Sequence, residues 1–72
     1  MIREEVIIFQ LNELKRQMLT LPTREREALH LRYYEDLSVP EIAEVMNVNR
    51  QSVSNFLQKA LSKLRSRWPV AV

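Results

Sequence analysis

The feature that most constrains the fold of this 72-residue chain is the complete absence of glycine. Glycine is the residue that most readily takes the positive φ angles of tight hairpin turns, and sheets built from hairpins depend on those turns. Runs of β-branched residues are also short. Hydrophobic residues nevertheless make up 46% of the chain, which is enough to build a helical core. We therefore expect an all-α fold.

Length and composition also limit the class of protein. A chain of 72 residues has the size of one small domain, and we expect one domain over residues 1–72. Cysteine is absent, which excludes disulfides and thiolate metal sites. The longest apolar run, Val6 to Phe9, is far too short to span a bilayer, and no signal-peptide pattern opens the chain. We expect a cytoplasmic protein that does not bind membranes.

Hydrophobic spacing predicts a first helix over residues 2–19. Apolar residues recur there at steps of four and three, the period of one helix face: Ile7, Leu11, Leu14 and Met18. The neighbouring apolar residues 6–9 make this stripe wider than one core contact requires. Two interpretations stay open. Either the helix is covered on two sides by its own domain, or it offers an adhesive surface to a partner or to a second copy of the chain.

Pro22 interrupts the pattern and favours the start of a second helix, which we predict over residues 22–36. Leu29 and Tyr33 lie one turn apart on this helix and are expected to contact the core. The opening charges, residues 24–27, alternate in sign and predict a solvated face.

A capping box predicts where the third helix begins. Ser38 and Glu41 have the spacing at which each side chain bonds to the backbone amide of the other at a helix start. A short helix over residues 39–46 follows. It is expected to bury Ile42, Ala43 and Met46.

A three-residue turn joins this helix to the last one. Asn47 tolerates the left-handed conformation that ends a helix, and Asn49 can cap the helix that we predict over residues 50–67. That helix has an apolar face at spacings of four, three and four: Val53, Leu57, Ala60 and Leu64. Two short capped helices and a three-residue turn are the layout of a helix-turn-helix, in a four-helix domain without winged elements. An ordinary helical hairpin is the alternative.

The charged residues are unevenly distributed along the chain. Residues 49–72 carry five basic side chains and no acidic one, whereas residues 22–48 carry three basic and six acidic side chains. The two segments therefore sum to +5 and −3, in a chain whose net charge is only +2. A cationic C-terminal helix suits the phosphate backbone of duplex DNA, so nucleic-acid binding is the leading hypothesis.

The outward face of the last helix holds the predicted DNA contacts. Glutamine and asparagine amides can make paired hydrogen bonds to adenine, arginine can do so to guanine, and lysine can contact phosphate. The predicted contact residues are Arg50, Gln51, Ser52, Ser54, Asn55, Gln58 and Lys59. Weaker phosphate contacts are predicted for Ser38, at a helix N-terminus, and for Lys63. Each has a structural alternative, a helix cap for Ser38 and a favourable charge near a helix C-terminus for Lys63.

No pattern in the chain indicates catalysis. His30 is the single histidine, and no second metal ligand or nucleophile lies at a spacing from it that is typical of a metal site or a catalytic site. The sequence also lacks a glycine-rich loop that could hold a phosphate. We therefore expect no enzyme activity, no cofactor and no metal site.

The stretch from Leu21 to Arg65 resembles region 4, the promoter-binding part, of bacterial sigma factors, and among them the small extracytoplasmic-function group. The segments that carry the resemblance are Leu21-Pro22, Leu31-Arg32-Tyr33-Tyr34, Leu37-Ser38, Glu41-Ile42-Ala43-Glu44, Ser52-Val53 and Leu64-Arg65. The combined pattern is specific, whereas any one of these segments alone is not.

This resemblance implies what the domain binds. It implies that the last helix lies in the major groove of the upstream (−35) promoter element and that the protein directs transcription initiation. It also implies docking on the β flap of the RNA polymerase core, with an anti-sigma factor as an inhibitor. The sigma region that melts promoter DNA is missing here, so the chain is either an excised domain or a stand-alone relative.

Departures from the family pattern keep alternatives open. Basic residues that are frequent in the family are replaced by Ser54, Phe56, Leu61 and Ser62, which predicts fewer phosphate contacts and a weaker dependence of DNA affinity on salt. Asn47 stands where glycine is frequent in the family. One alternative is the effector domain of a response-regulator-type activator. Another is a protein-interaction module that has kept the fold but lost DNA binding.

Overall fold

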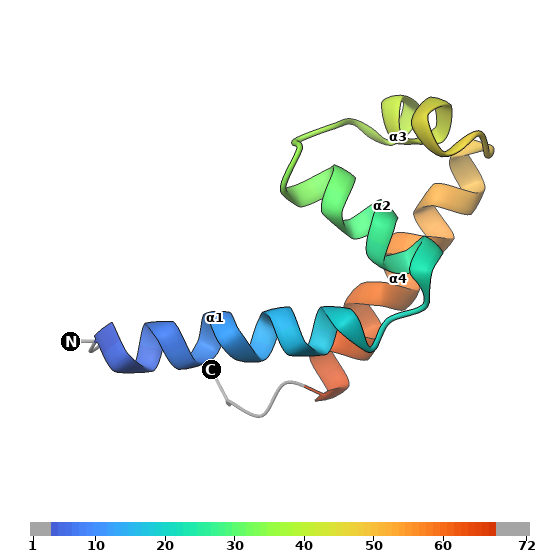
Figure 1. Ribbon diagram of the computed structural model, residues 1–72. Helices are drawn as coiled ribbons and strands as arrows, with labels where there is room; N and C mark the ends of the chain where they lie inside the picture. Colours follow the sequence, from blue (N-terminus) through green and yellow to red (C-terminus); the bar gives the residue numbers. More distant parts are fainter. Residues whose placement is uncertain (1–3, 68–72) are drawn as a thin grey trace.

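The computed structural model describes residues 4–67, with every side chain in that range except those of Gln10 and Arg67. It contains four helices, α1 (Glu4–Leu19), α2 (Thr23–Tyr33), α3 (Val39–Met46) and α4 (Arg50–Arg67), and no strand within the described range. Helices α2, α3 and α4 pack against one another, and α1 extends away from them (Figure 1). The expected all-α fold is therefore confirmed, with α3 and α4 as the helix-turn-helix.

Helices α3 and α4 coincide with the predicted ranges, and the predicted start of the first helix at residue 2 lies outside the described residues. The predicted end of the second helix at residue 36 is wrong, because α2 ends at Tyr33. Asp36 takes a left-handed conformation, with φ of 58°, and the Leu37 amide turns back to donate to the Leu31 carbonyl at 3.0 Å. A left-handed residue reverses the direction of the chain, so the helix cannot continue through it.

The capping box at the start of α3 is confirmed. The Ser38 amide donates to the Glu41 carboxylate at 2.9 Å, and the Glu41 amide donates to the Ser38 hydroxyl oxygen at 3.3 Å. Both bonds satisfy amides that have no partner within the helix. Ser38 lowers the pKa of the Glu41 carboxyl below its ordinary value. The larger cause is the hydrogen bond from the Ser38 amide, and the smaller is the hydrogen bond with the Ser38 side chain.

Hydrogen bonds on both sides fix the turn between α3 and α4. Asn47 adopts the predicted left-handed conformation, with φ of 56° and ψ of 48°. The Val48 amide donates back to the Ala43 carbonyl at 3.0 Å, which closes the end of α3. The Asn49 carboxamide then accepts from the Ser52 amide at 2.7 Å, so the predicted cap of α4 is confirmed. Together these bonds set the direction in which α4 leaves the turn.

The buried residues form two clusters that share α4. The first cluster lies beneath the helix-turn-helix and consists of Ala28, Ile42, Ala43, Met46 and Val53. The second cluster lies further along α4 and consists of Leu21, Leu29, Ala60 and Leu64. Three residues of the predicted apolar face of α4 are buried, and the fourth, Leu57, packs partly buried against both clusters. Burying one large aliphatic side chain contributes about 1.5–3 kcal/mol, so the inner face of α4 anchors this helix along its length.

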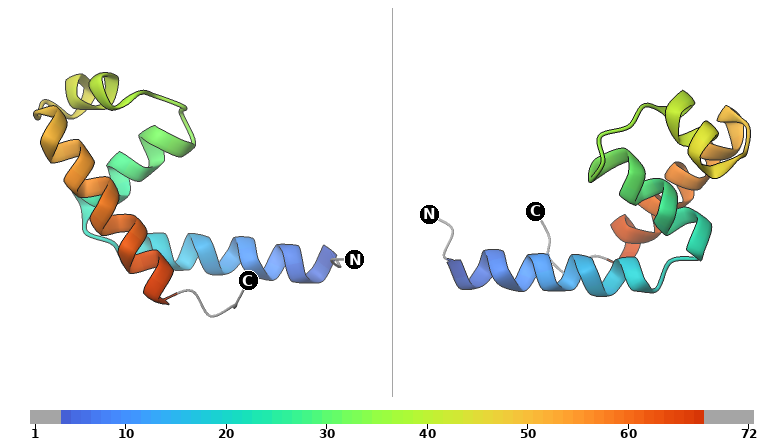
Figure 2. Two further views of the ribbon diagram at one scale, coloured as in Figure 1. Left: turned by 180° about the vertical axis from the view of Figure 1, so that it is seen from behind. Right: turned by 45° about the horizontal axis from the view of Figure 1, so that its top comes forward.

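One expectation about buried apolar residues is wrong, and one of the two open interpretations of the first helix does not hold for the described residues. Leu29 is buried as predicted, but Tyr33, one turn later at the end of α2, is 64% exposed. The other described helices leave α1 largely uncovered, since its apolar side chains from Val6 to Leu14 are exposed. Only the C-terminal end of α1 reaches the core, where Met18 packs against the second cluster. Figure 2 shows from two further directions that the N-terminal half of α1 stands clear of the other helices. The direction of α1 explains both exposures, because most of this helix extends away from α2 and α4 and does not pack against them (Figure 1).

Ser38→Ala removes the hydroxyl acceptor of the capping box. We expect this substitution to lower the free energy of unfolding by about 0.5–2 kcal/mol, the usual cost of losing a serine N-cap. Ser62→Ala makes the same change at an exposed position within α4 and is the matched control, with an expected effect below about 0.5 kcal/mol. Urea denaturation followed by circular dichroism measures both variants. Equal effects of the two substitutions would contradict the capping role.

The lowered pKa of Glu41 predicts a pH dependence of stability. A carboxyl whose pKa is lower in the folded state than in the unfolded chain stabilises the fold at neutral pH, and this contribution is lost as the pH falls from the ordinary glutamate range through the folded pKa. Glu41→Gln keeps a hydrogen-bond acceptor but removes the charge, so acidification should destabilise it less than wild type. Thermal unfolding between neutral and acidic pH measures the difference, and parallel pH profiles would refute it.

Candidate nucleic-acid interface

The outward face of α4 stands free of the core. Gln51, Asn55, Gln58 and Lys59 are exposed and follow one another at steps of four, three and one, which keeps them on one side of the helix. This side is opposite the buried face that enters the two clusters. The remaining predicted contacts lie at its margin: Arg50, exposed in the first turn, and the half-buried Ser52 and Ser54. The structure therefore brings the predicted contact residues together on one surface.

A hydrogen bond between two amides organises the first half of this face. The Gln51 Nε2 atom donates to the Asn55 Oδ1 atom at 3.1 Å. This bond leaves Gln51 Oε1 as an acceptor and Asn55 Nδ2 as a donor toward solvent. Adenine presents one acceptor, N7, and one donor, N6, in the major groove of DNA. The amide pair thus offers the complementary groups side by side.

All the charged side chains of α4 are basic. The segment from residue 50 to residue 67 contains no acidic side chain. Within the described part of the chain, Arg50 and Lys59 form no ion pair. Both cations therefore remain available to an anionic ligand. Their contact with the phosphates of a nucleic acid would release the counterions bound there, which favours binding.

A partly buried ion pair holds α4 against α2. Glu25 is only 7% exposed, and the Lys63 ammonium donates to both of its carboxylate oxygens, at 2.9 and 3.0 Å. The prediction that residues 24–27 form a solvated face is therefore wrong at Glu25. The sequence contains a signal for this contact, because Glu25 precedes Ala28 and Leu29 by three and four residues and so lies on the buried side of α2.

A second positioning contact joins α2 to the end of α3. The Arg24 Nη1 atom donates to the Met46 carbonyl at 3.1 Å. This carbonyl belongs to the last turn of α3, where carbonyl groups have no partner within the helix. The helix-turn-helix is therefore tied to α2 by a charged hydrogen bond. No local pattern indicates this contact, since 22 positions separate the two residues.

The two weaker predicted phosphate contacts are already used inside the domain. Ser38 bonds to Glu41 through both its amide and its hydroxyl, and Lys63 is paired with Glu25. Ser38 thus has the capping role that was its structural alternative, and Lys63 has a structural role that no local pattern predicted. Their contacts with phosphate stay predictions. The Glu41 carboxylate lies next to Ser38, where it repels an approaching anion.

The single histidine has partners close to it in sequence. The His30 ring stacks on the Tyr34 ring, with centroids 4.8 Å apart, and His30 Nε2 lies 3.5 Å from a Glu35 carboxylate oxygen. Among residues 4–67, no group of three or more histidine, cysteine, aspartate or glutamate side chains is placed to hold a metal ion. In the same range, no helix combines the length and the apolar character needed to cross a bilayer.

Comparison with known proteins identifies relatives of this chain. The family described as Sigma-70, region 4 matches residues 11–64. The RNA polymerase sigma factor SigF of Mycobacterium tuberculosis is 38% identical over 47 residues, which cover 65% of this chain and 18% of that protein. The RNA polymerase sigma-F factor of Kitasatospora aureofaciens is 38% identical over 49 residues, which cover 68% of this chain and 16% of that protein. No solved structure matches the chain.

Lys63→Ala leaves the buried Glu25 carboxylate without its partner. Because a buried charge is then uncompensated, we expect the free energy of unfolding to fall by about 1–3 kcal/mol, less than for a pair in which both partners are fully buried. Lys59→Ala removes an exposed lysine one turn earlier and is the matched control, with little expected effect on stability. Chemical denaturation measures both variants. A Lys63→Ala variant as stable as Lys59→Ala would contradict a structural role for the pair.

Proposed function

The chain belongs to the Sigma-70, region 4 family, and on this basis we propose that it binds duplex promoter DNA sequence-specifically as the region 4 domain of an RNA polymerase sigma factor. The observation that carries the proposal is the exposed polar face of α4, opposite the face that anchors the helix in both clusters. The chain spans less than a fifth of the length of the relatives named above. Directing transcription initiation is therefore part of the proposal, as is the treatment of residues 1–72 as one such domain.

Helix α4 is the element that enters the major groove of the upstream promoter element in this proposal. Gln51, Asn55 and Gln58 make hydrogen bonds to base edges. Arg50 and Lys59 are the cations, the first for guanine and the second for phosphate. Each good paired contact with a base discriminates against a wrong base by about 1–3 kcal/mol. Three amides on one side of a helix are thus enough to recognise a short sequence.

Contacts with the phosphate backbone fix the position of α4 in the groove. Ser52 and Ser54, at the margin of the outward face, are the proposed hydroxyl contacts. Ser38 and Lys63 remain weaker candidates, since both are engaged within the domain. The small number of available cations favours a weak dependence of affinity on salt, because each neutralised phosphate contributes about 0.9 to the slope of log affinity against log salt.

An apolar groove supports a second partner, the RNA polymerase core. The groove has a volume of about 640 Å³ and lies between α1, α2 and α4. Its apolar lining includes Leu14, Met18, Leu29, Tyr33 and Leu64. We propose that it receives part of the β flap, as the family resemblance implies, and that an anti-sigma factor acts as an inhibitor.

Four further points belong to the same proposal. They are membership of the extracytoplasmic-function group, a cytoplasmic location, a purely non-enzymatic role and self-association through the helix at residues 2–19. The exposed apolar side chains of α1 support the last point, because a free apolar surface of this extent favours association.

A protein-interaction module without DNA affinity is the second candidate function. The exposed apolar side chains of α1 favour it, together with the small number of cations on α4. The family match supports the sigma interpretation over the effector domain of a response-regulator-type activator. Titration of the chain with duplex DNA at low salt separates the two candidates, since the interaction module would bind no duplex under conditions that favour ionic contacts.

Gln51→Ala removes one amide of the proposed reading pair. Duplexes that bind the wild-type chain are first selected from a randomised library, and a scrambled duplex of equal length is the reference. Gln51→Ala should weaken binding to the selected duplex by about 1–3 kcal/mol and leave the scrambled duplex nearly unchanged. Lys59→Ala should weaken both duplexes about equally, because a phosphate contact carries no sequence information.

Asn12→Ala removes an exposed amide from the separate helix α1 and is the control for Gln51→Ala. It should bind both duplexes as tightly as wild type. Fluorescence anisotropy titrations at low salt measure all the affinities. Equal losses of Gln51→Ala on the two duplexes would exclude base reading by this residue, and absence of any duplex that binds the wild-type chain would favour the interaction module.

A further inference from the structure

Residues 6–14 of α1 expose six large apolar side chains. These are Val6, Ile7, Ile8, Phe9, Leu11 and Leu14. Ile8 and Leu11 are 57% and 54% exposed, in a region that stands clear of the other helices in every view (Figures 1 and 2). A concentration of exposed apolar side chains on a small domain marks an interaction site.

A regular stripe within this surface specifies the shape of the partner. Ile7, Leu11 and Leu14 follow at steps of four and three, the spacing of the contact seam of a coiled coil. Met18 continues the stripe to the point where α1 meets the second cluster. The stripe therefore fits an amphipathic helix that packs along α1.

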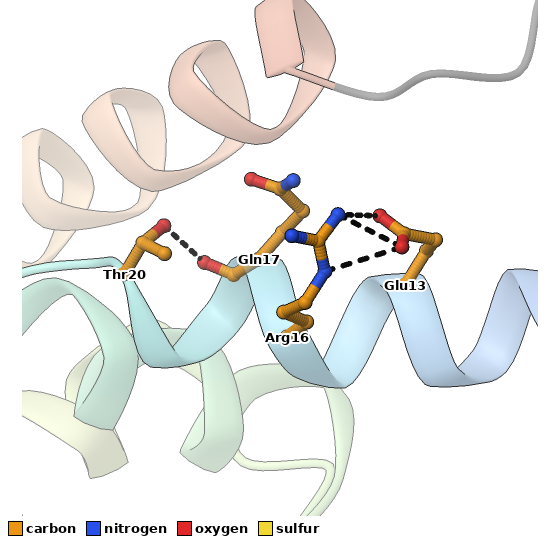
Figure 3. Close-up of polar contacts among 4 residues, drawn as sticks. All are labelled: Glu13, Arg16, Gln17 and Thr20. Atoms are coloured by element: carbon orange, nitrogen blue, oxygen red, sulfur yellow. Dashed lines mark hydrogen bonds and ion pairs between the residues drawn. The ribbon is translucent and has the colours of Figure 1, made fainter.

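The charges on α1 specify the partner further. Glu4 and Glu5 lie in its first turn, and Lys15 lies near its other end. None of these three forms an ion pair with a described residue. The ion pair found on α1 joins Arg16 to Glu13 at 2.6 Å (Figure 3), on the opposite side of the helix from the stripe. A matching helix presents a basic side chain to Glu4 and an acidic side chain to Lys15.

We propose that a second copy of this chain supplies the matching helix, with the two α1 helices packed antiparallel. In this arrangement Ile7 packs against Leu11 of the partner subunit. The same register brings Glu4 beside Lys15 of the partner subunit, and antiparallel helix dipoles attract each other. Every contact occurs twice, as an isologous two-fold interface requires. The inference rests on the self-association within the proposed function and not on DNA recognition by α4.

The charge balance of α1 disfavours a nucleic acid as the occupant. The helix carries three acidic side chains and two basic ones, which gives it a net charge of −1. A helix with a net negative charge repels the phosphate backbone of a nucleic acid. A second copy, by contrast, offers an apolar seam that matches this one. It also matches the charges at the helix ends, since the acidic end of one antiparallel α1 meets the basic end of the other.

Sedimentation equilibrium of the 72-residue chain tests the proposal. The wild-type chain should dimerise reversibly at micromolar concentration. Leu11→Glu should raise the dissociation constant by at least about a hundredfold, because the change occurs twice and burial of one leucine contributes at least about tenfold in affinity. Asn12→Glu adds the same charge at the next residue, off the stripe, and should leave the dimer intact. Circular dichroism verifies that both variants remain helical.

A charge exchange tests the antiparallel arrangement without touching the apolar seam. Glu4→Lys and Lys15→Glu should each weaken the homodimer several-fold at low salt, because each places like charges side by side. An equimolar mixture of the two variants should recover wild-type affinity, since the substituted positions then face opposite charges. In a parallel pair these positions do not meet, and neither single substitution would matter.

Two results would overturn the inference. One is a wild-type chain that stays monomeric up to millimolar concentration, which would assign the stripe to a different protein. The other is a mixture of the charge variants that associates no better than each variant alone. Neither result bears on the proposed DNA binding, because the stripe lies on α1 whereas the main proposed DNA contacts lie on α4. A dimeric wild type that binds no duplex supports the inference and contradicts only the proposed DNA binding.

Discussion

The double anchoring of α4 is the constraint on which the rest of the structure depends. Val53 enters one buried cluster, Ala60 and Leu64 enter the other, and Lys63 ties the same helix to the buried carboxylate of Glu25. A helix held in this way cannot rotate about its axis without disrupting a cluster. Its outward side chains therefore keep a fixed direction although they contribute nothing to the core. This separation of an anchoring side from a free side suits α4 to recognition.

The features that could be predicted from the sequence are those set by neighbours along the chain. The box formed by Ser38 and Glu41 and the caps at Asn47 and Asn49 each depend on bonds that span between three and five residues, so a local pattern is sufficient to identify them. Periodicity likewise identifies the two sides of α4, because one side of that helix is buried along its length. The helix-turn-helix could therefore be located from local patterns alone.

The errors concern contacts between segments that are distant in sequence. Glu25 pairs with Lys63 across 38 positions, and the local periodicity of α2 indicates that Glu25 lies on the buried side but not which residue pairs with it. Tyr33 and the stripe on α1 are exposed because periodicity identifies an apolar face but not the element that covers it. The roles of the contact residues between Arg50 and Lys59 stay predictions for a related reason. They are properties of a complex, whereas the sequence and the fold determine only where these side chains lie.

Because Gln51 and Asn55 hold each other before any ligand arrives, their two side chains do not adopt rotamers independently. Fewer rotamers are lost when such a pair meets its target, which favours tight association. The same linkage couples the two positions in evolution, since replacing one residue releases the other to reorient. A lineage of this protein that acquires a new target sequence would therefore be expected to change both side chains in concert rather than one base contact at a time.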